Sequence, residues 1–221
     1  MTDMQNLDLL PEEVLKEILL LEEQQKRLET RSEAQDKFMS YVKHVYDGFI
    51  EGTHHRIISK KLERIASGDL KRLIVNMPPR HSKSEFASYL MPSWFLGRNP
   101  KLKIIQATMN TELAVRFGRK VRDLIADPVY REIFPNTDLK PDSQAAGRWE
   151  TSAGGEYFAA GVGAAMTGRG ADLLIIDDPH SEQDALSTSA YDNAWEWYTS
   201  GPRQRLQPGG SIIIVQTRWS K

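Results

Sequence analysis

The chain of 221 residues contains no cysteine, which excludes disulfides and thiolate metal sites and is consistent with a reducing compartment. It also lacks any apolar run near the ~20 residues that a transmembrane helix needs. The N-terminus does not show the pattern of a secretory signal peptide. The five histidines are too scattered to indicate a transition-metal site. These absences favour a soluble intracellular protein.

An excess of charge of one sign is missing as well. The formal net charge is −1 and the pI is about 6.5, so no global signal indicates a nucleic-acid partner. Any contact with DNA would have to come from a local patch, such as Lys71, Arg72 and Arg80, or Arg203 and Arg205. The length suits one large domain, or one domain with an appendage, and allows a sizeable core.

The most informative segment is residues 72–84, an apolar run that enters a turn ending in Lys83 and Ser84. This order is typical of a buried strand that leads into a phosphate-binding loop and a helix. Backbone N–H groups at a helix N-terminus point at an anion. A lysine there reaches the terminal phosphates, and the adjacent hydroxyl can ligate Mg²⁺.

The loop lacks glycine where the general pattern G-x-x-x-x-G-K-[ST] has it. Met77 and Ser82 occupy the two glycine positions. Glycine is used there because close approach of a phosphate often needs backbone angles that other residues resist. Serine can adopt some of these angles at a cost in free energy. A basic loop before an amphipathic helix is the alternative interpretation of this segment alone.

A second apolar run, residues 173–176, ends in two carboxylates, Asp177 and Asp178. The carboxyl ends of parallel strands meet at one edge of a sheet, so these acids should lie beside the phosphate loop. Asp177 can hold Mg²⁺ directly or through water. Together the two segments predict an enzyme that hydrolyses ATP.

Strand and helix patterns alternate along most of the chain, which favours a mainly parallel, buried sheet flanked by helices. A polar helical extension is expected at the N-terminus. We predict helices over 7–31, 34–50, 56–67, 111–126 and 187–200 and from the phosphate loop to about residue 96, and strands over 72–77, 101–108, 148–153, 156–160, 172–177 and 211–215.

Three motifs in this order resemble the large terminase subunit of tailed bacteriophages: Pro-Pro-Arg-His-Ser-Lys-Ser, then Thr-Gly-Arg-Gly-Ala-Asp-Leu-Leu-Ile-Ile-Asp-Asp-Pro, then Ile-Val-Gln-Thr-Arg-Trp. The resemblance covers about residues 38–221 and implies the N-terminal ATPase domain of that family. It implies a P-loop NTPase fold of the ASCE or RecA-like type. We therefore expect a helical extension over 1–35 and the ATPase domain over 36–221. The family's nuclease domain would follow in a longer protein.

The resemblance also implies roles for loop residues. Lys83 would hold the β- and γ-phosphates, and Ser84 would ligate Mg²⁺ together with Asp177. The loop residues expected to bind ATP are Pro78, Pro79, Arg80, His81, Ser82, Lys83 and Ser84. Arg80 matches an arginine that stabilises the γ-phosphate in the family, and a guanidinium there would offset charge that develops in phosphoryl transfer. His81 is interpreted as shaping the loop.

The family usually has glutamate after the metal-binding aspartate, whereas this chain has Asp178, one methylene shorter. Asp178 is the favoured base by position, and Glu182 and Asp184 are the alternatives. Arg169 lies in a glycine-rich segment and is either a finger that acts on a neighbouring subunit's ATP or a solvated arginine. Sequence alone does not decide between Arg80 and Arg169 as the transition-state arginine.

Weaker signals surround these motifs. Thr217 follows the last strand, where the family has a coupling motif, and it could sense the γ-phosphate. His54 and His55 lie where related ATPases place adenine contacts, although an ordinary packed histidine is the commoner case. Gln106 to Thr108 match a strand end that helicase-like motors use to contact nucleic acid or to couple ATP hydrolysis to movement.

By resemblance, the partners would be double-stranded DNA, a small terminase subunit, a portal protein and further copies in a ring. The cofactors would be ATP and Mg²⁺, and the location would be the cytoplasm of an infected bacterium, transiently at the procapsid portal. A helicase-like ATPase that remodels DNA is one alternative. A nucleotide-binding assembly scaffold without turnover is the other, and the missing loop glycines and Asp178 keep it open.

Overall fold

The computed structural model describes residues 11–166 and 168–219. The helices are α1 (Glu12–Asp36), α2 (Phe38–Val45), α3 (Thr53–Ser67), the π-helix η2 (Glu85–Leu90), α4 (Met91–Arg98), α5 (Thr111–Ala126), α6 (Pro128–Ile133), η3 (Asp184–Leu186), α7 (Thr188–Ser200) and η4 (Pro202–Arg205). The strands are β1 (Arg72–Asn76), β2 (Lys103–Thr108), β3 (Leu139–Ala145), β4 (Arg148–Thr151), β5 (Glu156–Gly161), β6 (Ala171–Asp177) and β7 (Leu206–Gln216).

All seven strands form one sheet in the order β1-β7-β6-β2-β5-β4-β3. Neighbouring strands from β1 to β5 in this order are parallel, and β4 pairs antiparallel with both β5 and β3. Strand β7 lies between β1, which leads into the predicted phosphate loop (residues 78–84), and the strand β6, which ends at Asp177. The ends of β1, β7 and β6 therefore meet at one edge of the sheet, called the carboxyl edge below.

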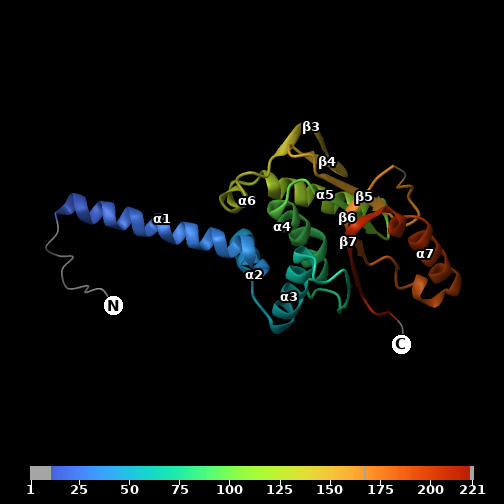
Figure 1. Cartoon of the computed structure of the whole chain (residues 1–221). Helices are drawn as coiled ribbons and strands as arrows, with labels where there is room; N and C mark the ends of the chain where they lie inside the picture. Colours follow the sequence, from blue (N-terminus) through green and yellow to red (C-terminus); the bar gives the residue numbers. More distant parts are fainter. Residues whose placement is uncertain (1–10, 167, 220–221) are drawn as a thin grey trace.

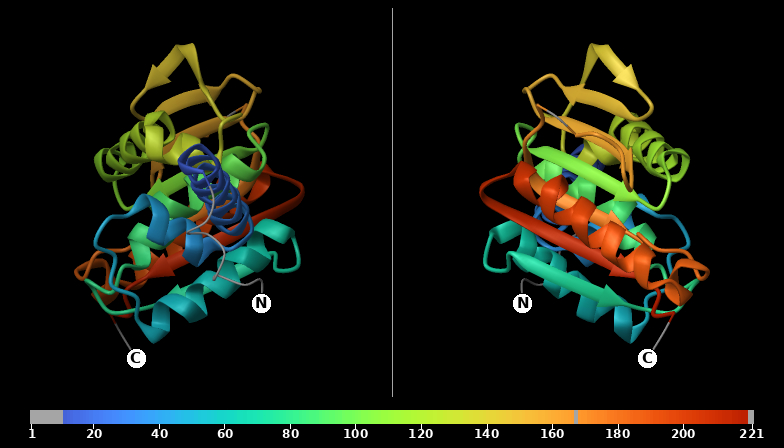
Figure 2. Two further views of the ribbon diagram at one scale, coloured as in Figure 1. Left: turned by 90° about the vertical axis from the view of Figure 1, so that its left-hand side faces the viewer. Right: turned by 90° about the vertical axis from the view of Figure 1, so that its right-hand side faces the viewer.

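Helices cover both faces of the sheet (Figure 2). On one face, α2 to α5 and η2 pack on Leu173, Ile175 and Ile213 in the larger core. On the other face, α7 packs on a smaller core with Leu174 and Ile176. Because β6 is covered on both faces, its side chains from Leu173 to Asp177 are all buried, which explains the continuous apolar run in its sequence.

Helix α1 projects away from the body (Figure 1). It is exposed along most of its 25 residues, and Ala34 is its buried residue. Two hydrogen bonds fix its C-terminal end, from Trp94 Nε1 to the Ala34 carbonyl at 2.9 Å and from Gln35 Nε2 to the Ile133 carbonyl at 2.6 Å. Among the described residues, no helix is both long enough and apolar enough to cross a membrane.

The prediction of a mainly parallel sheet flanked by helices, with an N-terminal helical extension, is confirmed. The first helix was predicted over 7–31. In the structure α1 has Pro11 as its N-cap, and residues 7–10 of the prediction lie outside the described residues. The hairpin around Gly154 forms between β4 and β5.

One predicted helix was wrong in extent, and two elements were missed. The helix predicted over 34–50 is divided between α1 and α2 and stops at Val45, before the turn at Gly48 with φ +68°. Helix α6 and strand β3 were not predicted. Strand β3, Leu-Lys-Pro-Asp-Ser-Gln-Ala, is polar and lies at the outer edge of the sheet, so its sequence resembles a loop and only pairing with β4 makes it a strand.

Candidate nucleotide-binding site

The segment between β1 and η2 is a tight turn. Two of its non-glycine residues have backbone angles in the left-handed region. Arg80 and Ser82 both have φ of +63°. Ser82 occupies the second glycine position of the general phosphate-loop pattern, so this residue does adopt the angle for which glycine is normally used. Met77, at the first glycine position, is not among the residues with positive φ. Left-handed backbone at a non-glycine residue costs on the order of 1–3 kcal/mol and is concentrated at functional sites.

Lys83 and Asp178 form an ion pair at the carboxyl edge. Lys83 Nζ lies 2.7 Å from Asp178 Oδ2, and the two side chains are 8% and 27% exposed. A buried ammonium needs a counter-charge, because its desolvation is costly when it is unpaired. The lysine of the loop and the acid directly after β6, far apart in the sequence, therefore lie in direct contact.

Asp178 also contacts the end of β7. Its Oδ1 accepts a hydrogen bond of 2.7 Å from the backbone N–H of Thr217, and its own N–H donates to the Val215 carbonyl at 2.8 Å. Asp178 has φ +42°, another left-handed non-glycine residue. This carboxylate thus connects the phosphate loop with the strand end that carries Thr217.

Asp177 is 2% exposed and is held by two hydroxyl groups of the helix that follows the loop. Ser84 Oγ donates to its Oδ1 at 2.9 Å and Ser88 Oγ donates to its Oδ2 at 2.6 Å. Burial raises the pKa of Asp177 from 3.8 to about 6, although both hydrogen bonds act in the opposite direction. The carboxyl group is therefore near its protonation equilibrium at mildly acidic pH.

The oxygen atoms of Ser84 and Asp177 fit a divalent cation. Carboxylate and hydroxyl oxygens are hard ligands of the kind that Mg²⁺ prefers, and Mg²⁺ commonly takes only one or two protein ligands beside phosphate oxygens and water. Within the described residues, no group of three or more histidine or acidic side chains could hold a metal. The site thus fits a cation that arrives with a nucleotide better than one held by a protein cage.

The two alternative bases do not join this cluster. Asp184 accepts hydrogen bonds of 2.8 Å from both the N–H and Oγ of Ser181, and the backbone bond is the main cause of its lowered pKa. It therefore fixes the turn of its own loop. Glu182 is exposed. Only Asp178 of the three candidates contacts Lys83 among the described residues.

The two candidate arginines lie at opposite edges of the sheet. Arg80 is exposed on the phosphate loop. Arg169 precedes β6 and pairs with Glu156 at the start of β5, with its guanidinium 3.9 Å from the centre of the Phe158 ring. Arg169 is thus placed at the starts of the strands, away from the loop of its own chain.

Histidines gather beside the loop. The His54 ring lies 3.9 Å from that of His55 and 5.8 Å from that of His81, between ring centres. His81 Nδ1 donates to the Pro79 carbonyl at 2.9 Å, a contact that shapes the loop. His55 is stacked on Phe86, its Nδ1 accepts the Gly52 N–H, and its buried Nε2 has no partner among the described residues.

Sequence reasoning missed Ser88. It lies one helical turn after Ser84, and both hydroxyls reach Asp177. The spacing of four residues was the available signal, because such residues share one face of a helix. Gln106 supports this arrangement from β2, since its Nε2 donates to Ser88 Oγ at 2.9 Å.

No family profile matches the sequence, and no curated protein matches it. Among solved structures, the fold is similar to that of the large terminase of bacteriophage HK97, with 12% sequence identity and a TM-score of 0.48. That match covers 82% of this chain and 37% of the HK97 chain, so this chain spans well under half of that protein.

Proposed function

We propose that this chain is the ATP-hydrolysing motor domain of a viral DNA-packaging terminase. The observation that carries the proposal is the contact of Lys83 with Asp178 at the carboxyl edge, beside Ser84 and Asp177. A loop lysine, a hydroxyl and two acids lie close together here, and these are residue types that phosphoryl transfer from ATP uses, which supports the proposal. The three sequence motifs that resemble terminases support the packaging context.

ATP would bind on residues 78–84, with the N–H groups at the start of η2 directed at its phosphates. Lys83 would exchange its contact with Asp178 for the β- and γ-phosphates, because the phosphates carry more negative charge than one carboxylate. That exchange would free Asp178 Oδ2. Arrival of the substrate would thus convert the counter-ion of Lys83 into an available base.

Asp178 would then orient a water molecule in line with the γ-phosphorus. The water oxygen forms the new bond to phosphorus, the bond to the β-phosphate bridging oxygen breaks, and ADP leaves with that electron pair. The water proton passes to the Asp178 carboxylate. Ser84 and Asp177 would hold Mg²⁺, which when bound neutralises charge on the β- and γ-phosphates.

Arg80 is the better candidate for transition-state stabilisation within one chain, because it belongs to the phosphate loop. Arg169 would serve only a neighbouring copy, and it would first have to leave Glu156 and Phe158. Thr217 is proposed to couple chemistry to movement, because its backbone N–H already contacts Asp178 Oδ1. When the γ-phosphate leaves, a shift of Asp178 would therefore move the backbone at the end of β7.

The proposed partners are double-stranded DNA, a small terminase subunit, a portal protein and further copies in a ring. The proposed location is the cytoplasm of an infected bacterium, at the portal during packaging. A nuclease domain is expected only in the longer protein. The division into an extension over 1–35 and an ATPase domain over 36–221 is part of the same proposal.

The test is ATP turnover by the full-length protein, with and without assembled procapsids, for the wild type, Lys83→Ala and Asp178→Asn. Turnover that procapsids stimulate and that both substitutions abolish is the expected result. Turnover lost only in Lys83→Ala would keep the motor and transfer the base to Glu182 or Asp184. ATP binding without turnover in any condition would replace the motor by a nucleotide-binding scaffold, and sustained unwinding of duplex DNA would replace it by a helicase.

A further inference from the structure

The second edge of the sheet, where the parallel strands begin, gathers basic residues from three separate segments. Strands β1, β2 and β7 start there, and α3, α4 and α7 run back to it, so residues 69–72, 98–103 and 202–205 converge. We call this the amino edge. Its cations come from all three segments: Lys71, Arg72, Arg98, Lys101, Arg203 and Arg205.

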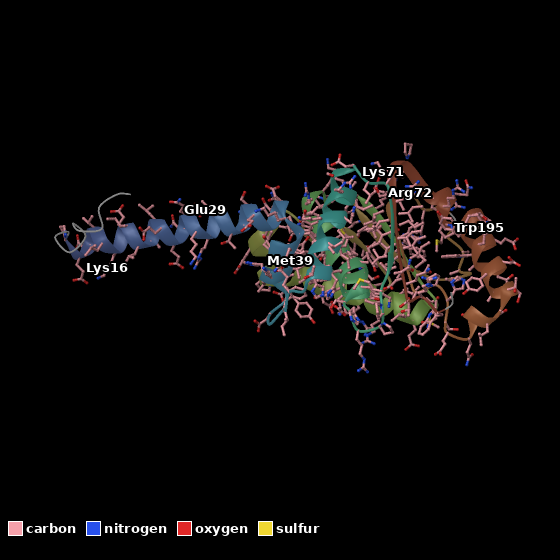
Figure 3. All side chains as sticks on the ribbon, turned by 90° about the horizontal axis from the view of Figure 1, so that it is seen from below. Lys16, Glu29, Met39, Lys71, Arg72 and Trp195 are labelled. Carbon is pink, nitrogen blue, oxygen red and sulfur yellow. The ribbon has the colours of Figure 1, made fainter. Side chains whose placement is uncertain are left out.

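Direct contacts join the first of these segments to the start of β7, and a surface hollow joins it to the second. Lys71 Nζ donates to the Gly209 carbonyl at 2.8 Å, and Arg72 Nη1 donates to the Gly210 carbonyl at 3.1 Å. Lys71 and Arg98 both line a surface hollow of about 390 Å³. Figure 3 shows Lys71 and Arg72 next to each other at the surface of the body.

Among the described residues, none of the six amino-edge cations forms an ion pair, whereas basic residues elsewhere are commonly paired. The Nε of Arg205 is buried without a hydrogen-bond partner. Two acids lie nearby, and neither forms an ion pair with these cations: Asp69 accepts from Ser67 Oγ, and Asp172 accepts from the backbone N–H of Lys103. Six cations beside two carboxylates leave this edge with a local excess of positive charge on a chain of net charge −1.

Clustered, unpaired cations repel one another and attract a polyanion. The exposed aromatic side chains of the described residues (Tyr46, Tyr191, Trp195 and Trp219) come from other segments, so this edge offers no stacking platform for the bases of a single strand. None of the exposed large apolar side chains of the described residues belongs to residues 69–72, 98–103 or 202–205, and the exposed Ile74 lies further along β1, so these segments lack the apolar face with which a helix enters a lipid surface. The phosphates of a duplex backbone fit an edge that has cations but no exposed stacking or large apolar side chains, because phosphates bind to positive charge without either.

We propose that the amino edge binds the phosphate backbone of double-stranded DNA, on the opposite side of the sheet from ATP. This inference rests on the proposed function, because that function supplies DNA as the partner. Strand β7 joins the two sites. It starts directly after Arg205 at the amino edge and ends beside Thr217 at the carboxyl edge.

The experiment measures binding of a fluorescein-labelled random-sequence duplex by anisotropy, between about 50 and 200 mM salt. Two variants alter different segments of the edge, Lys71→Ala/Arg72→Ala and Arg98→Gln/Lys101→Gln. The matched control, Arg116→Ala/Arg119→Ala, removes the same charge from α5. We expect each edge variant to reduce the slope of log affinity against log salt by about 2, and the control to behave as the wild type.

Binding of a fluorescent ATP analogue is measured in parallel and should be the same in all these variants. Equal slopes for the edge variants and the control would overturn the proposed surface. So would a wild-type chain that binds phosphatidylserine vesicles but no duplex. If the chain binds ATP but no duplex, the DNA surface is overturned and the ATPase proposal stands. If it binds duplex but no ATP, the ATPase proposal is overturned and the DNA surface stands.

Discussion

At the carboxyl edge of the sheet, charges neutralise one another: Lys83 contacts Asp178, and Asp177 is held by two serine hydroxyls. At the amino edge, Lys71, Arg72 and their neighbours have no carboxylate partner among the described residues. The same strands supply both edges. The difference shows that a parallel sheet can hold a buried cluster of paired charges at one edge and an exposed cluster of unpaired cations at the other.

Burial explains why the two edges behave differently. A charge in the interior must be paired, because the desolvation penalty of an isolated ion is several kcal/mol. A surface cation needs no partner, since water and salt screen it. The carboxyl edge is therefore sensitive to single atoms, whereas the amino edge should respond to the number of charges and to salt.

The largest effect is expected from Asp178→Asn. The amide keeps the size of the side chain but cannot take a proton, so turnover should fall about 10²–10⁴-fold. ATP affinity should be kept or increased, because Lys83 loses the carboxylate that competes with phosphate. Single-turnover hydrolysis and equilibrium binding of ATP would check this, with Lys71→Ala/Arg72→Ala as the control that changes neither. Weaker ATP binding in Asp178→Asn would contradict the exchange of partners.

A second test uses the pH dependence of stability. The pKa of Asp177 is raised to about 6, so the folded state binds more protons than the unfolded state between about pH 4 and 6. The free energy of unfolding that this group contributes is thus present at low pH and lost as pH rises through 6. Asp177→Asn should stabilise the chain at pH 7 by about 3 kcal/mol and remove this dependence.

Urea denaturation of the wild type and Asp177→Asn at about pH 4.5 and pH 7, on either side of the pKa of Asp177, would measure the difference in their free energies of unfolding. A constant difference between the two proteins at both pH values would show that Asp177 ionises normally. The control Lys71→Ala/Arg72→Ala keeps Asp177 and should therefore show the same pH dependence as the wild type.

A smaller effect is expected from Ser82→Gly. Ser82 has φ +63°, and glycine adopts this angle without the steric cost of a Cβ atom. The greater freedom of glycine in the unfolded chain offsets part of the gain, so the free energy of unfolding should rise by at most about 1 kcal/mol. Chemical denaturation measures it, and Ser67→Gly, at an exposed helix end, is the control that should destabilise.

The smallest effect is expected from the single change Arg98→Ala. It should lower the salt slope of duplex binding by about 1 and weaken binding only a few-fold at low salt. The guanidinium also lies 4.8 Å from the centre of the Trp94 ring, so a thermal melt must accompany the titration. Loss of affinity without a change in slope would indicate lost packing and not a lost phosphate contact.

Much of the fold could be predicted because the strands that build its centre have distinctive sequences. Residues 173–176 are apolar throughout, since β6 is buried on both faces. Strand β3 could not be predicted, because a polar edge strand with a proline has no local signal of its own. In the candidate site, Lys83, Ser84 and Asp177 were recognisable individually from the chemistry of phosphate and Mg²⁺.

The sequence by itself determined the alternation of strands and helices, the position of the loop between β1 and η2, and the two acids at the end of β6. Only the tertiary structure decided which residues meet. It placed Asp178, and neither Glu182 nor Asp184, against Lys83, and it brought Lys71 and Arg98 to one surface hollow. The reason is physical: local pattern fixes which strands form, whereas the order β1-β7-β6-β2 fixes which strand ends become neighbours.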